Sequence, residues 1–175
     1  MRIVGGMARG RPLKAKLPAT VRPTTEMARE AIFSMLQARG GVDDAVVVDL
    51  YCGSGAMGIE ALSRGAREAY FVDSDPACLE AARLNFESSR LDATVHFVRA
   101  TLPNWTIPAS ATIVFADPPY GPLDVTALLA STSAHTVVIE NDRYADAPAG
   151  WVIGKEKRYG TTLVTLLHRS EGEVA

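Results

Sequence analysis

A glycine-rich turn directly after a short apolar run is the feature that most constrains the fold. Residues 45–51 are mostly apolar and β-branched, and Gly53, Gly55 and Gly58 then form the pattern G-x-G-x-x-G. An apolar run of this length is typical of a buried parallel strand. A glycine motif between such a strand and a helix favours a βαβ unit that binds a ligand where the strand ends.

The rest of the chain repeats this alternation of strands and helices. It predicts an α/β fold with a Rossmann-like, doubly wound, mostly parallel seven-stranded sheet. Only a short turn separates the last two strands, so we expect an antiparallel C-terminal strand. The expected strands are 45–51, 68–73, 94–99, 112–116, 136–140, 151–156 and 161–168, and the expected helices are 57–64, 76–88 and 123–131. A further helix, capped by Thr24 or Thr25, precedes the first strand.

The composition is that of one ordinary folded domain. The chain has 175 residues, of which 47% are hydrophobic and 22% charged, values typical of a globular domain. Its two cysteines, Cys52 and Cys78, are too few for a disulfide framework or a four-cysteine zinc site. No apolar run approaches the about 18 residues of a membrane span, and no leader-like segment opens the chain. We expect a single cytoplasmic domain over 1–175, a monomer without an obligate protein partner, and no bound metal.

The charge is unevenly distributed along the chain. Residues 1–39 carry eight basic and two acidic residues, whereas the remainder carries ten basic and eighteen acidic ones. A basic arm on an acidic body favours a nucleic-acid partner. We therefore expect an N-terminal RNA-binding extension over 1–40, beginning with a hairpin formed by 3–6 and 9–13, and a catalytic core over 41–175. The candidate RNA-binding residues are Arg2, Arg9, Arg11, Lys14, Arg22 and Arg29, with Arg29 placed off the apolar stripe of its helix.

Two carboxylates near the glycine turn indicate the ligand. Asp73 ends the second strand, where a carboxylate can accept hydrogen bonds from ribose hydroxyls, which favours an adenosine-containing ligand. Asp49 would repel a dinucleotide pyrophosphate but attract an ammonium group, which favours S-adenosyl-L-methionine. Relatives of this fold often have an Asp after the third strand that binds the adenine amine, whereas this chain has RATL at 99–102. The adenine contact is therefore expected from the backbone or from Thr101. The predicted cofactor-binding residues are Asp49, Tyr51, Gly53, Ser54, Gly55, Asp73, Ser74, Thr101 and Asp117.

The sequence Asp117-Pro118-Pro119-Tyr120, which follows the fourth strand, indicates the reaction. The exocyclic amine of a nucleobase can donate its two N–H groups to the Asp117 carboxylate and the Pro118 carbonyl, and Tyr120 can stack on the base. This arrangement directs the nitrogen lone pair toward a sulfonium methyl group, and methyl transfer then depends on alignment more than on a strong base. We therefore predict that residues 117–120 are catalytic.

Taken together, these motifs resemble the RsmD family of bacterial 16S rRNA guanine-N2 methyltransferases. The resemblance implies a class I methyltransferase fold, S-adenosyl-L-methionine as methyl donor, and methylation of a guanine N2 amine in small-subunit rRNA. The implied partner is 16S rRNA in the small ribosomal subunit or its assembly intermediate. The family often has Phe-Ala and Glu where this chain has Tyr51-Cys52 and Asp73. The matching stretches are RIVGG at 2–6, RGR at 9–11, RPT at 22–24, REAIF at 29–33, DLYCGSGAMGIEALSRGA at 49–66 and DPPY at 117–120.

Two other functions stay open from the sequence. A DNA methyltransferase acting on adenine N6 or cytosine N4 would use the same Asp-Pro-Pro-Tyr motif, although no target-recognition domain is visible. Cytosine C5 methylation is less favoured, because neither cysteine lies in a matching nucleophile motif. A non-catalytic RNA-binding assembly factor that merely retains the fold is the third possibility.

Overall fold

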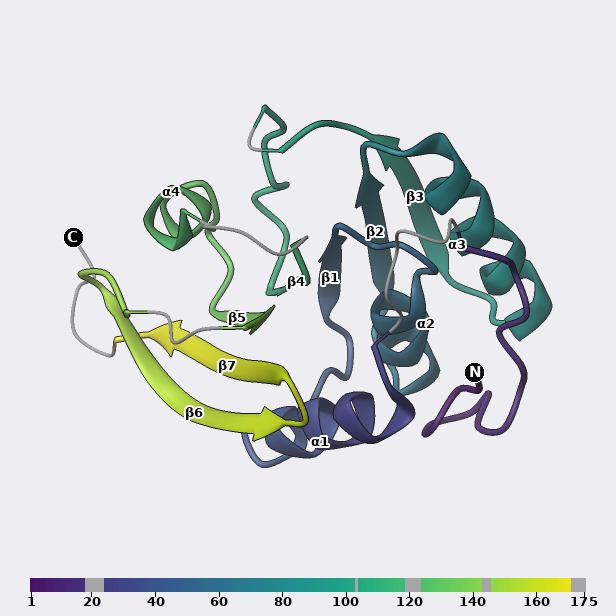
Figure 1. Cartoon of the computed structure of the whole chain (residues 1–175), viewed down its shortest axis with the longest axis horizontal. Coiled ribbons are helices and arrows are strands. Elements are labelled where there is room, and N and C mark those ends of the chain that lie inside the picture. The colour runs from purple at the N-terminus through teal and green to yellow at the C-terminus, as the bar shows by residue number, and fades with distance from the viewer. Residues whose placement is uncertain (18–23, 103, 119–123, 143–145, 171–175) are drawn as a thin grey trace.

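One seven-stranded sheet organises the molecule. The computed structural model describes residues 1–17, 24–102, 104–118, 124–142 and 146–170. Within these residues the strand order is β3-β2-β1-β4-β5-β7-β6 (Figure 1). β1 to β5 are parallel, and β7 runs antiparallel between β5 and β6. The strands are β1 (Val46–Leu50), β2 (Glu68–Asp73), β3 (Thr94–Arg99), β4 (Ile113–Ala116), β5 (Thr136–Asn141), β6 (Trp151–Tyr159) and β7 (Thr162–Arg169).

The predicted fold class is confirmed, with small shifts at element ends. Four helices are described: α1 (Glu26–Gln37), α2 (Ala56–Ser63), α3 (Pro76–Ser89) and α4 (Val125–Ala130). β6 continues to Tyr159, beyond the expected end at 156, because its pairing with β7 extends to Thr162 at the turn. None of the described helices is long and apolar enough to cross a membrane.

Two hydrophobic cores lie on the two faces of the sheet. Alternate strand residues face opposite sides, so Val47 and Phe115 belong to one core while Val48 and Val114 belong to the other. The first core also contains buried residues of α1 and α2, whereas the second contains Leu129 of α4. Asp49, two residues after Val47, therefore lies on the face that α1 and α2 cover.

The N-terminal arm forms the expected hairpin and packs onto the fold. The backbone N–H of Ile3 donates to Arg11 O at 3.0 Å, and that of Gly10 donates to Ile3 O at 2.8 Å. Ile3, Ala8 and Leu13 are buried in the first core. The arm is therefore fastened to the sheet-covering helices rather than projecting as a free tail.

Candidate active site at the carboxyl ends of the central strands

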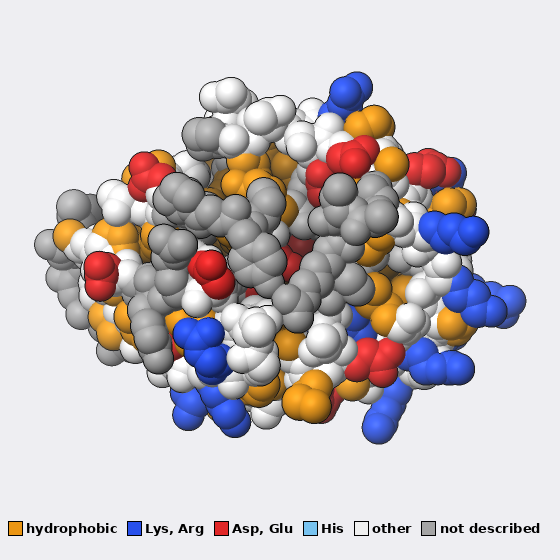
Figure 2. Space-filling model, in the orientation of Figure 1, with side chains coloured by type: hydrophobic (Ala, Val, Ile, Leu, Met, Phe, Trp, Pro, Cys, Tyr) orange, Lys and Arg blue, Asp and Glu red, His pale blue; other side chains and the backbone are white. Residues whose placement is uncertain are grey.

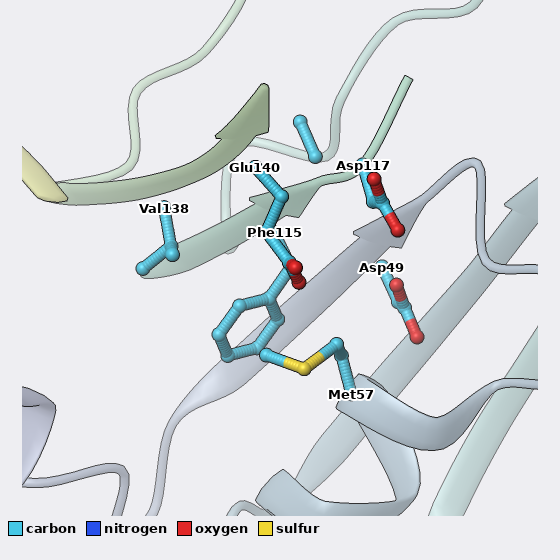
Figure 3. A pocket seen from close by; sticks show the side chains of 7 residues that line it. Asp49, Met57, Phe115, Asp117, Val138 and Glu140 are labelled. Carbon is cyan, nitrogen blue, oxygen red and sulfur yellow. The ribbon is translucent and has the colours of Figure 1, made fainter. Parts of the chain in front are cut away.

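A small cavity opens where β1, β4 and β5 end. Figure 3 shows three carboxylates on one side of it, those of Asp49, Asp117 and Glu140. Asp117 and Glu140 directly follow Ala116 and Ile139, which pair with each other across β4 and β5. The cavity is lined by Asp49, Met57, Phe115, Ala116, Asp117, Val138 and Glu140. In the view of Figure 2, acidic side chains are visible in a hollow near the middle of the molecule, and Lys and Arg side chains lie mostly toward its edges.

The glycine turn between β1 and α2 is built from left-handed backbone. Tyr51, Gly53 and Gly55 have φ values of 57°, 51° and 72°. Asp73 secures the turn from the neighbouring strand, since its Oδ2 accepts the N–H of Gly53 at 3.0 Å. A Cβ on Gly55 would lie 2.9 Å from Ala82 Cβ, so only glycine fits at this position.

Asp49 caps helix α2 from outside the helix. The N-cap residue Gly55 has no side chain to satisfy the first helical N–H groups. Instead, the backbone N–H of Gly58 donates to Asp49 Oδ2 at 2.9 Å. A phosphate group would need these same N–H groups at the helix N-terminus. Because a carboxylate already occupies part of this terminus, the geometry supports the predicted preference against a dinucleotide.

The cavity concentrates buried carboxyl groups that are held toward their protonated forms. Burial raises the pKa of Asp49 to about 8, and the nearby Asp117 and Asp73 add to the rise. Burial likewise raises the pKa of Glu140 to about 8, with a further contribution from Asp117. A bound cation would favour the ionised form of these carboxyl groups and would be stabilised by it. Among the described residues, no group of three or more His, Cys, Asp or Glu side chains is placed to hold a metal ion.

Comparison with known proteins identifies the family. The chain matches the family model described as conserved hypothetical protein 95 over residues 1–168. It is 30% identical over 186 residues to the Escherichia coli K12 ribosomal RNA small subunit methyltransferase D, covering 99% of this chain and 92% of that protein. The chain belongs to the RsmD family.

Solved structures agree with this family assignment. The Escherichia coli protein yhhF superposes with a TM-score of 0.81 at 30% identity, covering 98% of this chain and 99% of that one. An RNA methyltransferase of Salinibacter ruber, solved with S-adenosyl-L-homocysteine, shares the fold with a TM-score of 0.65 at 22% identity, covering 87% and 96% of the two chains. The predicted Rossmann-like methyltransferase fold is therefore confirmed, and S-adenosyl-L-methionine is the cofactor of this family.

The site of this RsmD-family chain fits that cofactor chemically. S-adenosyl-L-methionine carries positive charge on its sulfur and on its amino group, and the buried Asp49 carboxylate offers a matching negative charge. Asp73 is only partly buried and ends β2 beside the turn, so its oxygens can also accept hydrogen bonds from ribose hydroxyls. Gly53 has no Cβ that could limit the approach of a ligand to the turn, whereas Gly55 is packed against Ala82 and Phe71.

The other predicted cofactor residues differ in their exposure. Tyr51 is partly buried at the start of the turn. Ser54 is buried, and its carbonyl accepts the Asn85 Nδ2–H at 3.0 Å, which ties the turn to α3. Ser74 and Thr101 are exposed, directly after β2 and shortly after β3. All four follow the carboxyl ends of β1, β2 or β3. Their contacts with the cofactor stay predictions.

The Asp-Pro-Pro-Tyr segment is described up to Pro118. Asp117 and Pro118 are both partly exposed and follow β4 directly. The hydroxyl of Thr24 lies 3.3 Å from Asp117 Oδ2 and 3.2 Å from Glu140 Oε1. The predicted roles of Pro119 and Tyr120 concern residues outside the described ranges. The structure thus brings Asp117 to the same cavity as Asp49, as the two motifs predict.

Three of the six predicted RNA-binding side chains are exposed in the part of the chain that the structure describes. Arg2, Arg9 and Lys14 are exposed, although Arg2 Nη1 also donates to Gly10 O at 2.8 Å. Arg11 is partly buried, and its guanidinium donates to Ser89 O at the end of α3. Arg22 lies outside the described residues. The exposed members of the arm are accessible to a partner, and their contacts with RNA stay predictions.

The prediction for Arg29 is wrong in its placement. Its side chain is 0% exposed, although Arg29 is predicted to lie off the apolar stripe of its helix. The Arg29 guanidinium donates to Arg2 O and lies 3.9 Å from Glu60 Oε2. Because these partners are inside the fold, Arg29 joins the arm to α1 and α2 and presents no charge to RNA.

The sequence motifs do not predict the contacts of three side chains at or near the site. The Thr24 hydroxyl lies within hydrogen-bonding distance of Asp117 and Glu140, which line the cavity. Glu60, 1% exposed, accepts the backbone N–H groups of Val4 at 2.8 Å and Gly5 at 2.7 Å. Glu140 lies near the end of an apolar strand that neighbours β4, which was an available signal. Thr24 is marked in the sequence only as a possible helix cap and as part of the RPT stretch, and neither indicates a contact with Asp117.

Proposed function

We propose that this chain transfers a methyl group from S-adenosyl-L-methionine to the exocyclic N2 amine of a guanine in 16S rRNA, of the type at position 966. The main support is that Asp117 and Asp49 line the same cavity. Asp49 belongs to β1, just before the glycine turn, and Asp117 begins the Asp-Pro-Pro-Tyr motif. The Escherichia coli relative is named as a methyltransferase of small-subunit ribosomal RNA, which supports rRNA methylation as the class of reaction.

The chemistry follows from the residues that line the cavity. When bound, S-adenosyl-L-methionine supplies a methyl group on a positively charged sulfur. Asp117 would accept one N–H of the target amine, and the Pro118 carbonyl would accept the other. Holding both N–H groups fixes the direction of the nitrogen lone pair, so the rate depends on alignment and electrostatic complementarity.

The arm supplies the proposed contact with RNA. Arg2, Arg9 and Lys14 are exposed on a hairpin that packs beside α2 and α3. Their contacts with phosphates would be independent of sequence and would weaken with added salt. The proposed substrate is 16S rRNA within the small subunit or an assembly intermediate, with the enzyme a cytoplasmic monomer.

Transfer of a labelled methyl group to three substrates tests this proposal. Naked 16S rRNA, small subunits and duplex DNA are each incubated with the enzyme and labelled S-adenosyl-L-methionine, and the products are digested to nucleosides. Label in N2-methylguanosine from RNA supports the proposal. Label confined to methylated adenine or cytosine from DNA would establish the DNA methyltransferase instead, and RNA binding with no label in any nucleoside would favour an assembly factor.

A further inference from the structure

Two carboxyl groups that line the cavity, those of Asp117 and Glu140, lie within reach of one hydroxyl. Thr24 Oγ1 lies 3.3 Å from Asp117 Oδ2 and 3.2 Å from Glu140 Oε1. The three groups come from separate parts of the chain, namely the residue before the α1 N-cap, the end of β4 and the end of β5. The contact therefore depends on the tertiary fold. Neither Glu140 nor Thr24 takes part in the proposed hydrogen bonds from the target amine to Asp117 and Pro118.

The hydrogens at this contact can be arranged in two ways. A threonine hydroxyl has a single hydrogen to donate. If both carboxylates were ionised, only one could receive that hydrogen, and two negative charges would face each other across the hydroxyl. If one carboxyl keeps its proton, it donates to Thr24 Oγ1, and Thr24 then donates to the other carboxylate. Every contact is then satisfied in a single direction.

Burial decides which carboxyl keeps the proton. Glu140 is 5% exposed and Asp117 is partly exposed, so ionising Glu140 loses more hydration. Asp117 and Asp49 disfavour the ionisation of Glu140, whereas the hydrogen bond with Thr24 and the charge of Arg29 favour it. Burial and the two carboxylates prevail, and they raise the pKa of Glu140 to about 8. The proton therefore stays on Glu140, and Asp117 is left as the ionised acceptor.

Thr24 is held in place independently of this contact. Arg29 Nη1 donates to Thr24 O at 3.5 Å, and Thr25 begins α1 by accepting the N–H of Ala28 at 3.2 Å. The helix N-terminus thus fixes the backbone of Thr24, and the Thr24 side chain is left to act on the cavity. A hydroxyl anchored in this way can limit the rotation of the Asp117 carboxylate.

We propose that Glu140 is a positioning residue, which acts through the Thr24 hydroxyl to orient Asp117 as the acceptor for the target amine. This inference rests on the proposed methylation of an exocyclic amine. Glu140 donates to Thr24, Thr24 donates to Asp117 Oδ2, and the Asp117 carboxylate is held facing the cavity. Glu140 itself touches neither the base nor the methyl group.

Matched substitutions separate this role from a purely structural one. Thr24→Val removes the hydroxyl without changing the helix cap at Thr25, and Thr24→Ser restores it. Because misalignment of a catalytic group is costly, we expect Thr24→Val to lower kcat by about 10-fold or more. KM for S-adenosyl-L-methionine should change by less than about 2-fold, since the hydroxyl orients the base acceptor. Thr24→Ser and the exposed-loop control Asp92→Asn should retain wild-type kcat.

The pH profile tests Glu140 directly. Glu140→Gln retains a donor to Thr24 but cannot ionise. We expect the wild-type rate to fall at alkaline pH as Glu140 loses its proton, and Glu140→Gln to remove that fall. An unchanged alkaline fall in Glu140→Gln, or a wild-type kcat in Thr24→Val, would overturn the inference while wild-type methyl transfer still supports the proposed function. Wild-type enzyme that methylates no RNA would overturn both.

A measurement without substrate gives an independent readout. Carbon-13 NMR of the glutamate carboxyl groups follows protonation in the ligand-free protein. We expect one glutamate signal that titrates well above the others in wild type and is missing in Glu140→Gln. If all glutamates titrate together near their ordinary pKa, Glu140 does not hold the proton and the inference fails, whatever the activity.

Discussion

Replacing Asp49 by Asn tests the balance between stability and cofactor binding at this site. Asn has nearly the same shape as a protonated Asp, and its Oδ1 can still accept the N–H of Gly58, which Asp49 holds at 2.9 Å. The substitution therefore keeps the cap of helix α2 and removes only the ability to ionise. Any change in the pH dependence of stability then reports the buried charge itself.

The sign and size of the effect follow from the raised pKa of Asp49. The folded protein keeps a proton on Asp49 up to about pH 8, whereas the unfolded chain loses it near pH 3.8. Between these values the folded state binds more protons, so this contribution to the free energy of unfolding is complete at low pH and is lost as pH rises. The expected slope is about 1.4 kcal/mol per pH unit, or about 3 kcal/mol between pH 5 and 7.

Urea unfolding of the ligand-free protein at several pH values measures this effect. The difference in unfolding free energy, Asp49→Asn minus wild type, should rise by about 3 kcal/mol from pH 5 to pH 7. The same variant should bind S-adenosyl-L-methionine more weakly, because the ligand loses a compensating negative charge. Parallel pH profiles for the two proteins would refute the assignment of a buried, costly carboxylate at position 49.

Two further predictions concern the arm and the glycine turn. Arg9→Ala should weaken RNA binding and lower the slope of log affinity against log salt by about 1, whereas the buried Arg29→Met should leave that slope unchanged and cost about 3 kcal/mol in urea unfolding. A smaller slope of log RNA affinity against log salt in Arg29→Met than in wild type would contradict the assignment of Arg29 to the interior. Gly58→Ala would place a Cβ 2.4 Å from Phe71 Cε1, so it should cost about 1–3 kcal/mol of stability. Adding Phe71→Leu should recover part of that loss, and full stability of the single variant would contradict the close contact.

Contiguous motifs made the cofactor half of the site predictable. Asp49, Gly53 and Gly55 are neighbours in sequence, and the strand before them is a continuous apolar run. Their geometry is therefore mostly local, set by one strand, one turn and one helix. Asp117 was predictable for the same reason, because its motif follows a recognisable strand and the doubly wound order places that strand beside β1.

Side chains that act through tertiary contacts were not predictable. Arg29 was expected outside the apolar stripe, yet the buried residues of α1 are Ala28, Arg29, Ile32, Phe33 and Leu36. Hydropathy periodicity cannot indicate that backbone carbonyls and Glu60 will enclose a guanidinium. Thr24 and Glu140 are 116 residues apart in the chain, so their meeting with Asp117 depends on the packing of α1 against β4 and β5.

The rate of methyl transfer by Asp117→Ala tests the central claim most directly. Wild type and variant are compared in single-turnover transfer of labelled methyl to small-subunit RNA, with retention of S-adenosyl-L-methionine measured on the same preparations. If Asp117 holds the target amine, the variant should transfer methyl about 100-fold or more slowly at saturating cofactor. Transfer at the wild-type rate would contradict the placement of the reaction at this cavity.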